Sequence, residues 1–182
     1  MIIRPTLAAL VLGIAPAWAE TSPSGVDLMT TGAIGSAMEF SSALTGQWTG
    51  RGTVLPSLDM ERPFNVKCTF TAEADDATFD LDGECGALFM KRPVRTSLVA
   101  MADGRLTGVY DADLRSGQAS LEGAADGTRI DLDVEWGDEV NGDRTARMLI
   151  EREGEALRIR TMDLDPATGE EVTTTDLTLT QG

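Results

Sequence analysis

The stretch GQWTGRG, residues 46–52, decides the fold that we expect for this chain. Alternate residues of a strand share a face, so Trp48, Gly50 and Gly52 point to one side. One bulky ring is therefore followed by two positions without a side chain. Glycine weakens a strand unless a bend of the sheet or a closely approaching ligand or backbone needs the room. The stretch predicts the first strand of a small closed barrel, in which these glycines serve the bend, a ligand, or both.

Alternation of apolar and polar residues recurs after this stretch, with a turn signal behind each run. The dipeptides at residues 103–104, 126–127 and 141–142 are Asp-Gly or Asn-Gly, which hairpin turns favour because they accept positive φ. Further strands are expected near residues 64–74, 79–85, 94–102, 105–112, 118–123, 130–136, 145–151, 157–163 and 171–180.

These runs follow one another without a long helical period, which favours an antiparallel up-and-down β-barrel over a βαβ fold or a Greek-key sandwich. We expect an all-β, calycin-like barrel of about 8–10 strands, with a short N-terminal helix within residues 37–44 closing one end. Local patterning does not report closure, so a sandwich stays open as an alternative.

The N-terminal segment has the layout of a cleaved secretory signal. Arg4 precedes an apolar run over residues 7–14, and the small-residue ending Ala17-Trp18-Ala19 comes before Glu20. The predicted organisation is a signal peptide over residues 1–19, a flexible arm rich in Ser, Thr and Gly over residues 20–37, and one barrel domain over residues 38–182. The expected location is the periplasm or the medium of a bacterium, without a membrane span.

The chain carries 30 acidic and 15 basic residues, a formal net charge of −15. Such a surface disfavours nucleic acid and anionic membranes. The acidic residues alternate with apolar ones, which predicts a solvated outer face of the sheet. A docking surface for a basic partner is the alternative.

The two cysteines, Cys68 and Cys85, are predicted to form a structural disulfide. If residues 64–74 and 79–85 form a hairpin that turns at residues 75–78, opposed residues have numbers that sum to 153. Directly opposed residues are close enough for a disulfide. The predicted pairs are all apolar or small: Ala74 with Phe79, Ala72 with Leu81, Phe70 with Gly83, and Cys68 with Cys85.

The chain has no histidine, which removes the usual general base for a Ser or Cys nucleophile, the usual haem ligand and most zinc sites. Asp131, Asp133 and Glu135 alternate with apolar residues and are expected in solvent, and no enclosed pair of carboxylates is visible. Residues 163–170 are rich in oxygen ligands but lack the EF-hand spacing, so they predict a hairpin turn. We therefore expect a protein that is not an enzyme and has no cofactor or metal.

The barrel interior is the expected place of function. Its predicted lining is apolar with a few aromatic rings, which fits either a cavity for one small apolar molecule or a packed core. The lining consists of Trp48, Val54, Val66, Phe70, Leu81, Tyr110, Ile130, Val134, Trp136, Met148, Ile150, Leu157 and Ile159. The residues predicted to contact a ligand are Trp48, Gly50, Gly52, Phe70, Tyr110, Val134, Trp136 and Met148.

At Gly46-Gln47-Trp48 the chain resembles the lipocalin and calycin superfamily, whose first strand carries Gly-x-Trp. The longer pattern Gly-x-Trp-x-Gly-x-Gly is similar to that of the ten-stranded nitrobindin-type barrels. The resemblance implies a small hydrophobic ligand and a Trp48 that closes one end. Nitrobindin-like proteins hold haem iron by histidine, and since this chain has none, haem binding is not carried over.

The predicted function is therefore that of a secreted or periplasmic lipocalin-like protein that binds a small hydrophobic molecule without catalysis. Two other functions remain open. One is inhibition of an extracellular protease by the N-terminal arm, since small secreted bacterial barrels with one disulfide resemble a family of metalloprotease inhibitors. The other is an envelope protein with a packed barrel and protein partners.

Overall fold

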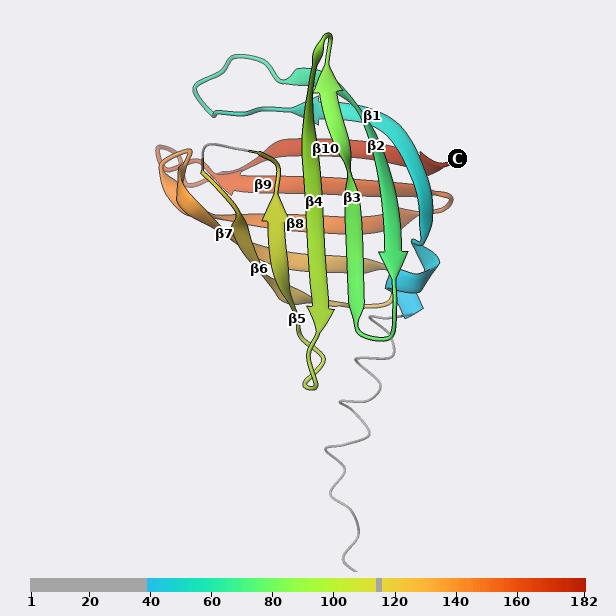
Figure 1. Ribbon diagram of the computed structural model, residues 1–182. Helices are drawn as coiled ribbons and strands as arrows, with labels where there is room; N and C mark the ends of the chain where they lie inside the picture. Colours follow the sequence, from blue (N-terminus) through green and yellow to red (C-terminus); the bar gives the residue numbers. More distant parts are fainter. Residues whose placement is uncertain (1–38, 114–115) are drawn as a thin grey trace, which may run out of the picture.

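The computed structural model describes residues 39–113 and 116–182. The expected signal peptide and arm lie outside these residues. Within them, ten antiparallel strands follow one another around a closed barrel, in which β1 pairs with both β2 and β10 (Figure 1). The strands are β1 (Gly46–Val54), β2 (Phe64–Ala74), β3 (Thr78–Ala87), β4 (Met90–Ala100), β5 (Leu106–Asp111), β6 (Ala119–Ala125), β7 (Arg129–Val140), β8 (Asp143–Glu153), β9 (Ala156–Leu164) and β10 (Glu171–Gln181).

The up-and-down barrel and all ten expected strands are confirmed, with a short helix at residues 39–43. The sandwich alternative is excluded, because β1 and β10 close the sheet over seven paired positions. The largest differences in strand bounds are at the end of β7, which lies at Val140 and not at residue 136, and at the β3–β4 hairpin, where β4 begins at Met90 and not near residue 94. The turn there is Leu88-Phe89, which carries none of the usual turn residues. No helix in the described part of the chain is long and apolar enough to cross a membrane.

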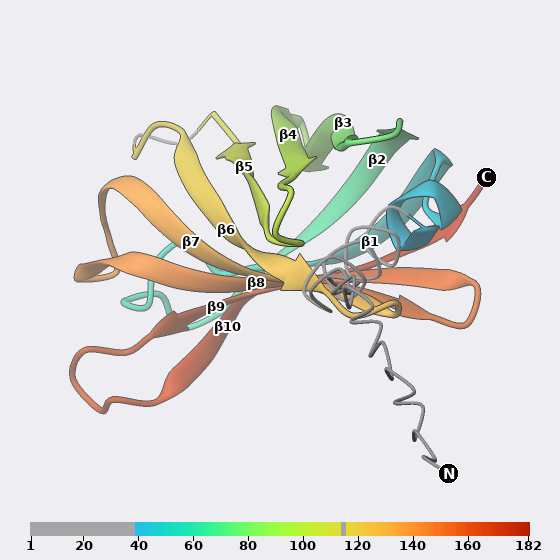
Figure 2. The same ribbon diagram turned by 90° about the horizontal axis from the view of Figure 1, so that it is seen from below.

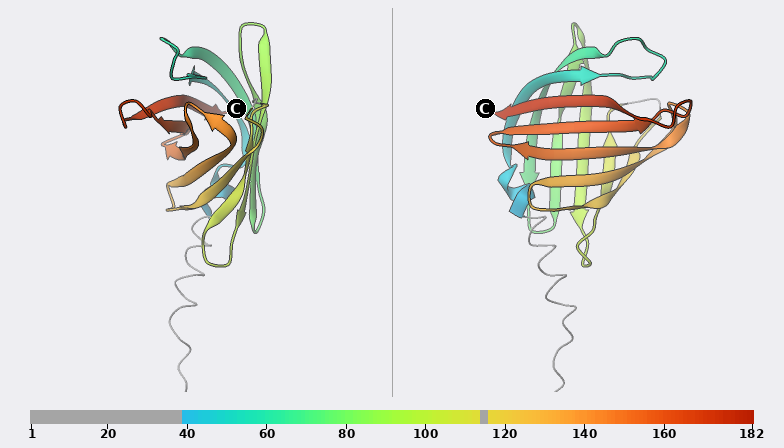
Figure 3. Two further views of the ribbon diagram at one scale, coloured as in Figure 1. Left: turned by 90° about the vertical axis from the view of Figure 1, so that its left-hand side faces the viewer. Right: turned by 180° about the vertical axis from the view of Figure 1, so that it is seen from behind.

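The barrel is formed by two crossing layers. Strands β2–β4 run across the direction of β8–β10, and β1 curves from one layer to the other (Figures 1 and 3). Gly50 and Gly52 lie in this curved strand. A Cβ added at Gly50 would lie 2.0 Å from the carbonyl oxygen of Thr178, and one added at Gly52 would lie 2.0 Å from that of Asp176. The room beside both glycines is therefore occupied by the backbone of β10, as the bend interpretation requires.

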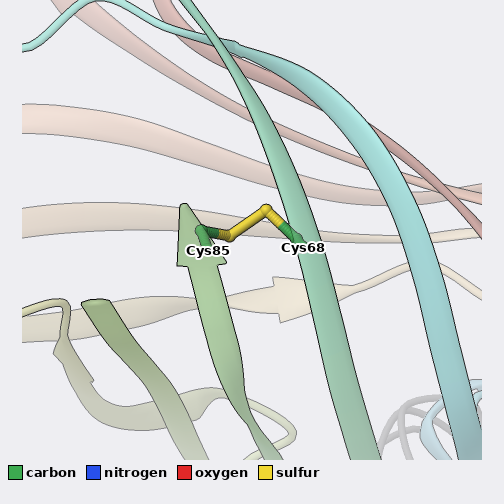
Figure 4. Close-up of a disulfide and its surroundings, with 2 residues drawn as sticks. All are labelled: Cys68 and Cys85. Carbon is green, nitrogen blue, oxygen red and sulfur yellow. A yellow bond between two sulfur atoms is a disulfide. The ribbon is translucent and has the colours of Figure 1, made fainter. Parts of the chain in front are cut away.

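The β2–β3 hairpin has the predicted register. Cys68 lies opposite Cys85, and the other three predicted pairs are also found. The two cysteines form a disulfide with a Cα–Cα distance of 4.1 Å (Figure 4). Cys68 is buried in the barrel core, so the disulfide lies on the inner face of the sheet.

One end of the barrel is closed by the short helix, which lies beside the start of β1 (Figure 2). Phe40 and Leu44 are buried there against Trp48, whose exposed fraction is 1%. The indole Nε1 of Trp48 donates a hydrogen bond to the carbonyl oxygen of Leu44 at 2.6 Å. From this end a continuous apolar cluster extends through the barrel and includes Phe79, Leu98, Leu121, Ile130, Leu132, Ile150, Leu157 and Leu179.

Candidate functional site: a buried polar cluster at the barrel end opposite the helix

The end of the barrel opposite the helix holds a buried carboxylate, that of Asp163. Its exposed fraction is 3%, and it is the one charged residue that is buried among residues 39–113 and 116–182. Carboxylates are rarely buried without a partner, because the charged form loses its hydration. Asp163 therefore places a polar, ionisable group in an otherwise mainly apolar interior.

Strand register brings Asp163 together with Trp136. Ala146 of β8 pairs with Val134 of β7 on one side and with Asp163 of β9 on the other. Trp136 follows Val134 by two residues and so shares its inner face. Strands two apart are about 10 Å from each other, and the small side chain of Ala146 leaves the space between them to the indole and the carboxylate.

Three side chains approach the carboxylate of Asp163. The hydroxyl of Thr174 donates a hydrogen bond to its Oδ2 at 2.5 Å, and Thr174 Oγ1 also lies 3.3 Å from the carbonyl oxygen of Thr161. Burial raises the pKa of Asp163, and the charge of Asp143 acts in the same direction. Thr174 opposes this rise in pKa because its hydroxyl donates to the charged form, and the polar groups of Asn141 and Trp136, which face the carboxylate without forming a hydrogen bond to it, act in the same direction as Thr174. We call Asp163, Thr174, Asn141 and Trp136 the Asp163 cluster.

The Asp163 cluster contains two buried polar atoms without a hydrogen-bond partner among the described residues. These are Oδ1 of Asp163 and Nε1 of Trp136. One is an acceptor and the other a donor. Buried polar atoms are nearly always paired, so two complementary orphans at one place need an explanation, such as a bound group. A hydroxyl group placed between them could donate to the carboxylate and accept from the indole.

An aromatic wall borders the cluster. The rings of Tyr110, from β5, and Trp136 meet edge to face with a centroid distance of 6.0 Å and an interplanar angle of 70°. Burial raises the pKa of Tyr110 to about 12, so its phenol is neutral at physiological pH. A surface hollow of about 250 Å³ reaches this wall, and it is lined by Val109, Gln118, Ala119, Ser120, Glu135, Trp136, Gly137 and Arg144.

The loop between β1 and β2 is fastened to this end of the barrel. The main-chain amide of Leu58 donates to Oδ1 of Asn141 at 3.0 Å, and that of Leu55 donates to the carbonyl of Thr174 at 2.7 Å. Asn141 lies in the β7–β8 turn and has a φ of 57°, a conformation that Asn tolerates in such turns. The same Asn141 thus contacts the covering loop and faces Asp163.

The residues predicted to contact a ligand fall into four places. Trp48 and Phe70 pair across β1 and β2 near the closed end. Gly50 and Gly52 lie in the bend, and Val134 and Met148 belong to the packed apolar cluster. Tyr110 and Trp136 form the aromatic wall at the end opposite the helix. The other predicted lining residues are buried or packed against the core. Asp163 was not predicted as a site residue.

The remaining carboxylates behave as surface groups. Asp133 and Glu135 are exposed, and Asp131 is paired with Arg147 on the outer face. Residues 165–170 form a turn, in which the side chain of Asp165 accepts from the amide of Ala167 at 2.8 Å and the hydroxyl of Thr168 at 3.0 Å. No group of three acidic or cysteine residues within the described ranges is arranged to hold a metal ion.

Comparison with models of known protein families gives no match, and comparison with curated proteins gives none either. The closed ten-stranded antiparallel barrel is consistent with a calycin-like fold.

Proposed function

We propose that this protein binds a small, mainly apolar molecule that carries a hydroxyl or a similar hydrogen-bonding group, and that it does so without catalysis. The observation that carries the proposal is the pair of buried orphan atoms, Oδ1 of Asp163 and Nε1 of Trp136. Ligand sites are typically apolar with a few convergent polar groups, and the end of the barrel opposite the helix has this composition.

The ligand is expected at the end of the barrel opposite the helix and not in the middle. The middle is filled by a continuous cluster of buried apolar side chains. At that end, the rings of Tyr110 and Trp136 offer an apolar wall, and the hollow of about 250 Å³ reaches Trp136. The proposed ligand therefore places its apolar body against this wall and its polar group between Asp163 and Trp136.

Binding is favoured over catalysis because Asp163 stands alone. Paired carboxylates are the usual acid and base of glycosidases, and no second charged residue is buried within the described segments. Histidine, the commonest general base, does not occur in the chain. A single buried carboxylate with a raised pKa suits recognition of a hydroxyl group, because either protonation state can form a hydrogen bond with it.

We further propose a lipocalin-like ancestry and a periplasmic or extracellular location. The Gly-x-Trp strand and the closed barrel support the first, and the disulfide supports an oxidising compartment. A packed envelope protein without a ligand is the second candidate, and the continuous apolar cluster favours it.

The test compares a naphthol with naphthalene, two probes that differ by one hydroxyl group. Calorimetry should detect binding of the naphthol about tenfold or more tightly than naphthalene, as one hydrogen bond to a charged buried group contributes about 1.5–3 kcal/mol. Trp136→Phe should remove most of this preference, and Trp48→Phe, at the opposite end, should keep it. Equal affinity for the two probes, or no binding of either, would overturn the proposal and favour the packed barrel.

A further inference from the structure

The hairpin between β3 and β4 ends in three exposed apolar side chains. The exposed fractions are 98% for Leu88, 100% for Phe89 and 73% for Met90. This hairpin projects beyond the neighbouring turns, away from its own barrel (Figure 1). We call residues 88–90 the apolar tip. Contiguous exposed apolar residues mark interaction sites in soluble proteins, whereas single ones do not.

The backbone of the tip adds a second observation. Leu88 has a φ of 54°, a left-handed conformation that Gly or Asn adopts at much lower conformational cost. A turn that only had to connect two strands would be served better by either of those residues. A leucine at this position indicates that the side chain itself is used.

Basic residues follow the tip directly, although acidic residues outnumber basic ones in the chain. The side chains of Lys91, Arg92 and Arg95 are 70%, 57% and 68% exposed. Each pairs with an acidic residue of its own molecule, but exposed ion pairs are weak and exchange readily. The tip therefore presents an apolar end on a positively charged neck.

The outer face of the barrel carries a hollow with the complementary character. It has a volume of about 620 Å³ and extends over β4–β8. Its apolar part includes Val99 and Val109, which are 41% and 38% exposed. Glu122, Asp133 and Glu135 also line it, and Glu135 forms an exposed ion pair with Arg144 beside the hollow. The hollow is thus an apolar surface with a negatively charged rim.

We propose that the apolar tip of one copy of this chain inserts into the outer hollow of a second copy. The basic neck would then meet the acidic rim, so that both the apolar contact and the charges match. Because the tip and the hollow are different surfaces, two copies close into a dimer only when each tip fills the other's hollow; otherwise the contact repeats from copy to copy. The net charge of −15 makes distant copies repel, so association is expected at high protein concentration only.

Sedimentation velocity over a range of protein concentrations tests this inference. The protein purified from cells should self-associate as its concentration rises. Phe89→Ser should raise the dissociation constant of this self-association at least tenfold. The double variant Lys91→Glu/Arg92→Glu should also lose association, and mixing it with Glu122→Lys/Glu135→Lys should restore it. Glu155→Lys is the charge control and should keep association, because Glu155 is exposed in the β8–β9 turn and belongs to neither surface.

Three results would overturn the inference. They are a monomer at every concentration, association that Phe89→Ser does not change, and charge reversals that fail to restore each other. Flotation of the monomer with vesicles of phosphatidylglycerol and phosphatidylethanolamine, lost in Phe89→Ser, would assign the tip to a lipid surface instead. Circular dichroism of each variant establishes that the barrel is intact, since all the altered side chains are exposed or line the outer face.

Discussion

The indole of Trp48 and the carbonyl of Leu44 form a hydrogen bond of 2.6 Å that joins the short helix to the first strand. Both residues are fully buried, so neither group has water as an alternative partner. The contact gives the indole N–H of Trp48, the one polar group of this buried side chain, a hydrogen-bond partner.

Trp48→Phe should therefore lower the free energy of unfolding by more than the loss of buried side-chain volume alone would. The carbonyl of Leu44 would remain buried without a partner, at a cost of about 1–3 kcal/mol. Trp136→Phe is the matched control, because it removes a similar volume from the core but a donor that has no partner. Urea unfolding should give a lower midpoint for Trp48→Phe than for Trp136→Phe, and equal midpoints would contradict this reading.

Removal of the disulfide should destabilise the chain without changing the fold. Cys68 and Cys85 are 17 residues apart, and closing a loop of this length contributes about 3 kcal/mol in the chain-entropy model. The double variant Cys68→Ala/Cys85→Ala and the reduced natural chain should lose similar free energies of unfolding. A reductant should leave the double variant unaffected. A loss below about 1 kcal/mol would show that the hairpin is already ordered in the unfolded chain.

Asp163 should make the barrel less stable as the pH rises. Its folded-state pKa lies above the usual 3.8, so the folded protein holds this proton more tightly than the unfolded chain does. Its contribution to stability is full below pH 3.8 and is lost as the pH rises through the raised pKa. Asp163→Asn imitates the protonated form, so the free energy of unfolding of this variant, relative to that of the natural chain, should improve as the pH rises above 3.8. An unchanging difference in urea midpoint would contradict the raised pKa.

Asp176 should have the opposite effect on the pH dependence of stability. Arg158 donates to both of its carboxylate oxygens at 2.9 Å, which lowers the pKa of Asp176. Its contribution is present above pH 3.8 and is lost as the pH falls through the lowered pKa. Because the pair is partly exposed, Asp176→Asn should cost only about 0.5–1 kcal/mol at pH 7. That cost should shrink toward zero in acid, and a cost that grows in acid would exclude this pairing in solution.

Gly50 should not tolerate a side chain. A Cβ there would lie 2.0 Å from the carbonyl oxygen of Thr178, which belongs to backbone and yields only if the seam between β1 and β10 opens. Gly50→Ala should destabilise the barrel by about 3 kcal/mol, as overpacking does. Thr49→Ala, on the neighbouring exposed position, is the control and should change little. Tolerance of alanine at Gly50 would remove the close approach as the reason for glycine.

The pairing of β2 with β3 could be predicted because only one register opposes both cysteines and keeps Phe70, Ala72 and Leu81 on one face. The β3–β4 turn could not, since Leu88 and Phe89 carry no turn signal. The closure of the barrel could not be predicted from local sequence patterns either. It depends on β1 meeting β10, and alternation in one strand says nothing about a strand so distant.

The Asp163 cluster was missed for a related reason. Leu157, Ile159, Thr161 and Asp163 alternate in β9, which would have placed the carboxylate inside, but Asp163 stands at the end of the run beside an apparent turn. Toward the end of β9 the inner positions are the polar Thr161 and Asp163, and the opposite face carries the apolar and buried Met162, so polarity no longer distinguishes the two faces there. The approach of Trp136 to Asp163 further depends on two strand pairings, one of which contains a register shift after Glu135.

The seam between β1 and β10 has a consequence for how the chain reaches its folded state. These two strands are the most widely separated in the sequence of any pair that meets in the barrel. Until β10 arrives, a growing chain has an open sheet whose two edges, β1 and β9, offer unpaired amides and carbonyls to any other strand. Contacts of such long range also form slowly. The interval before the last strand arrives is therefore when this protein is most exposed to aggregation and most in need of a chaperone.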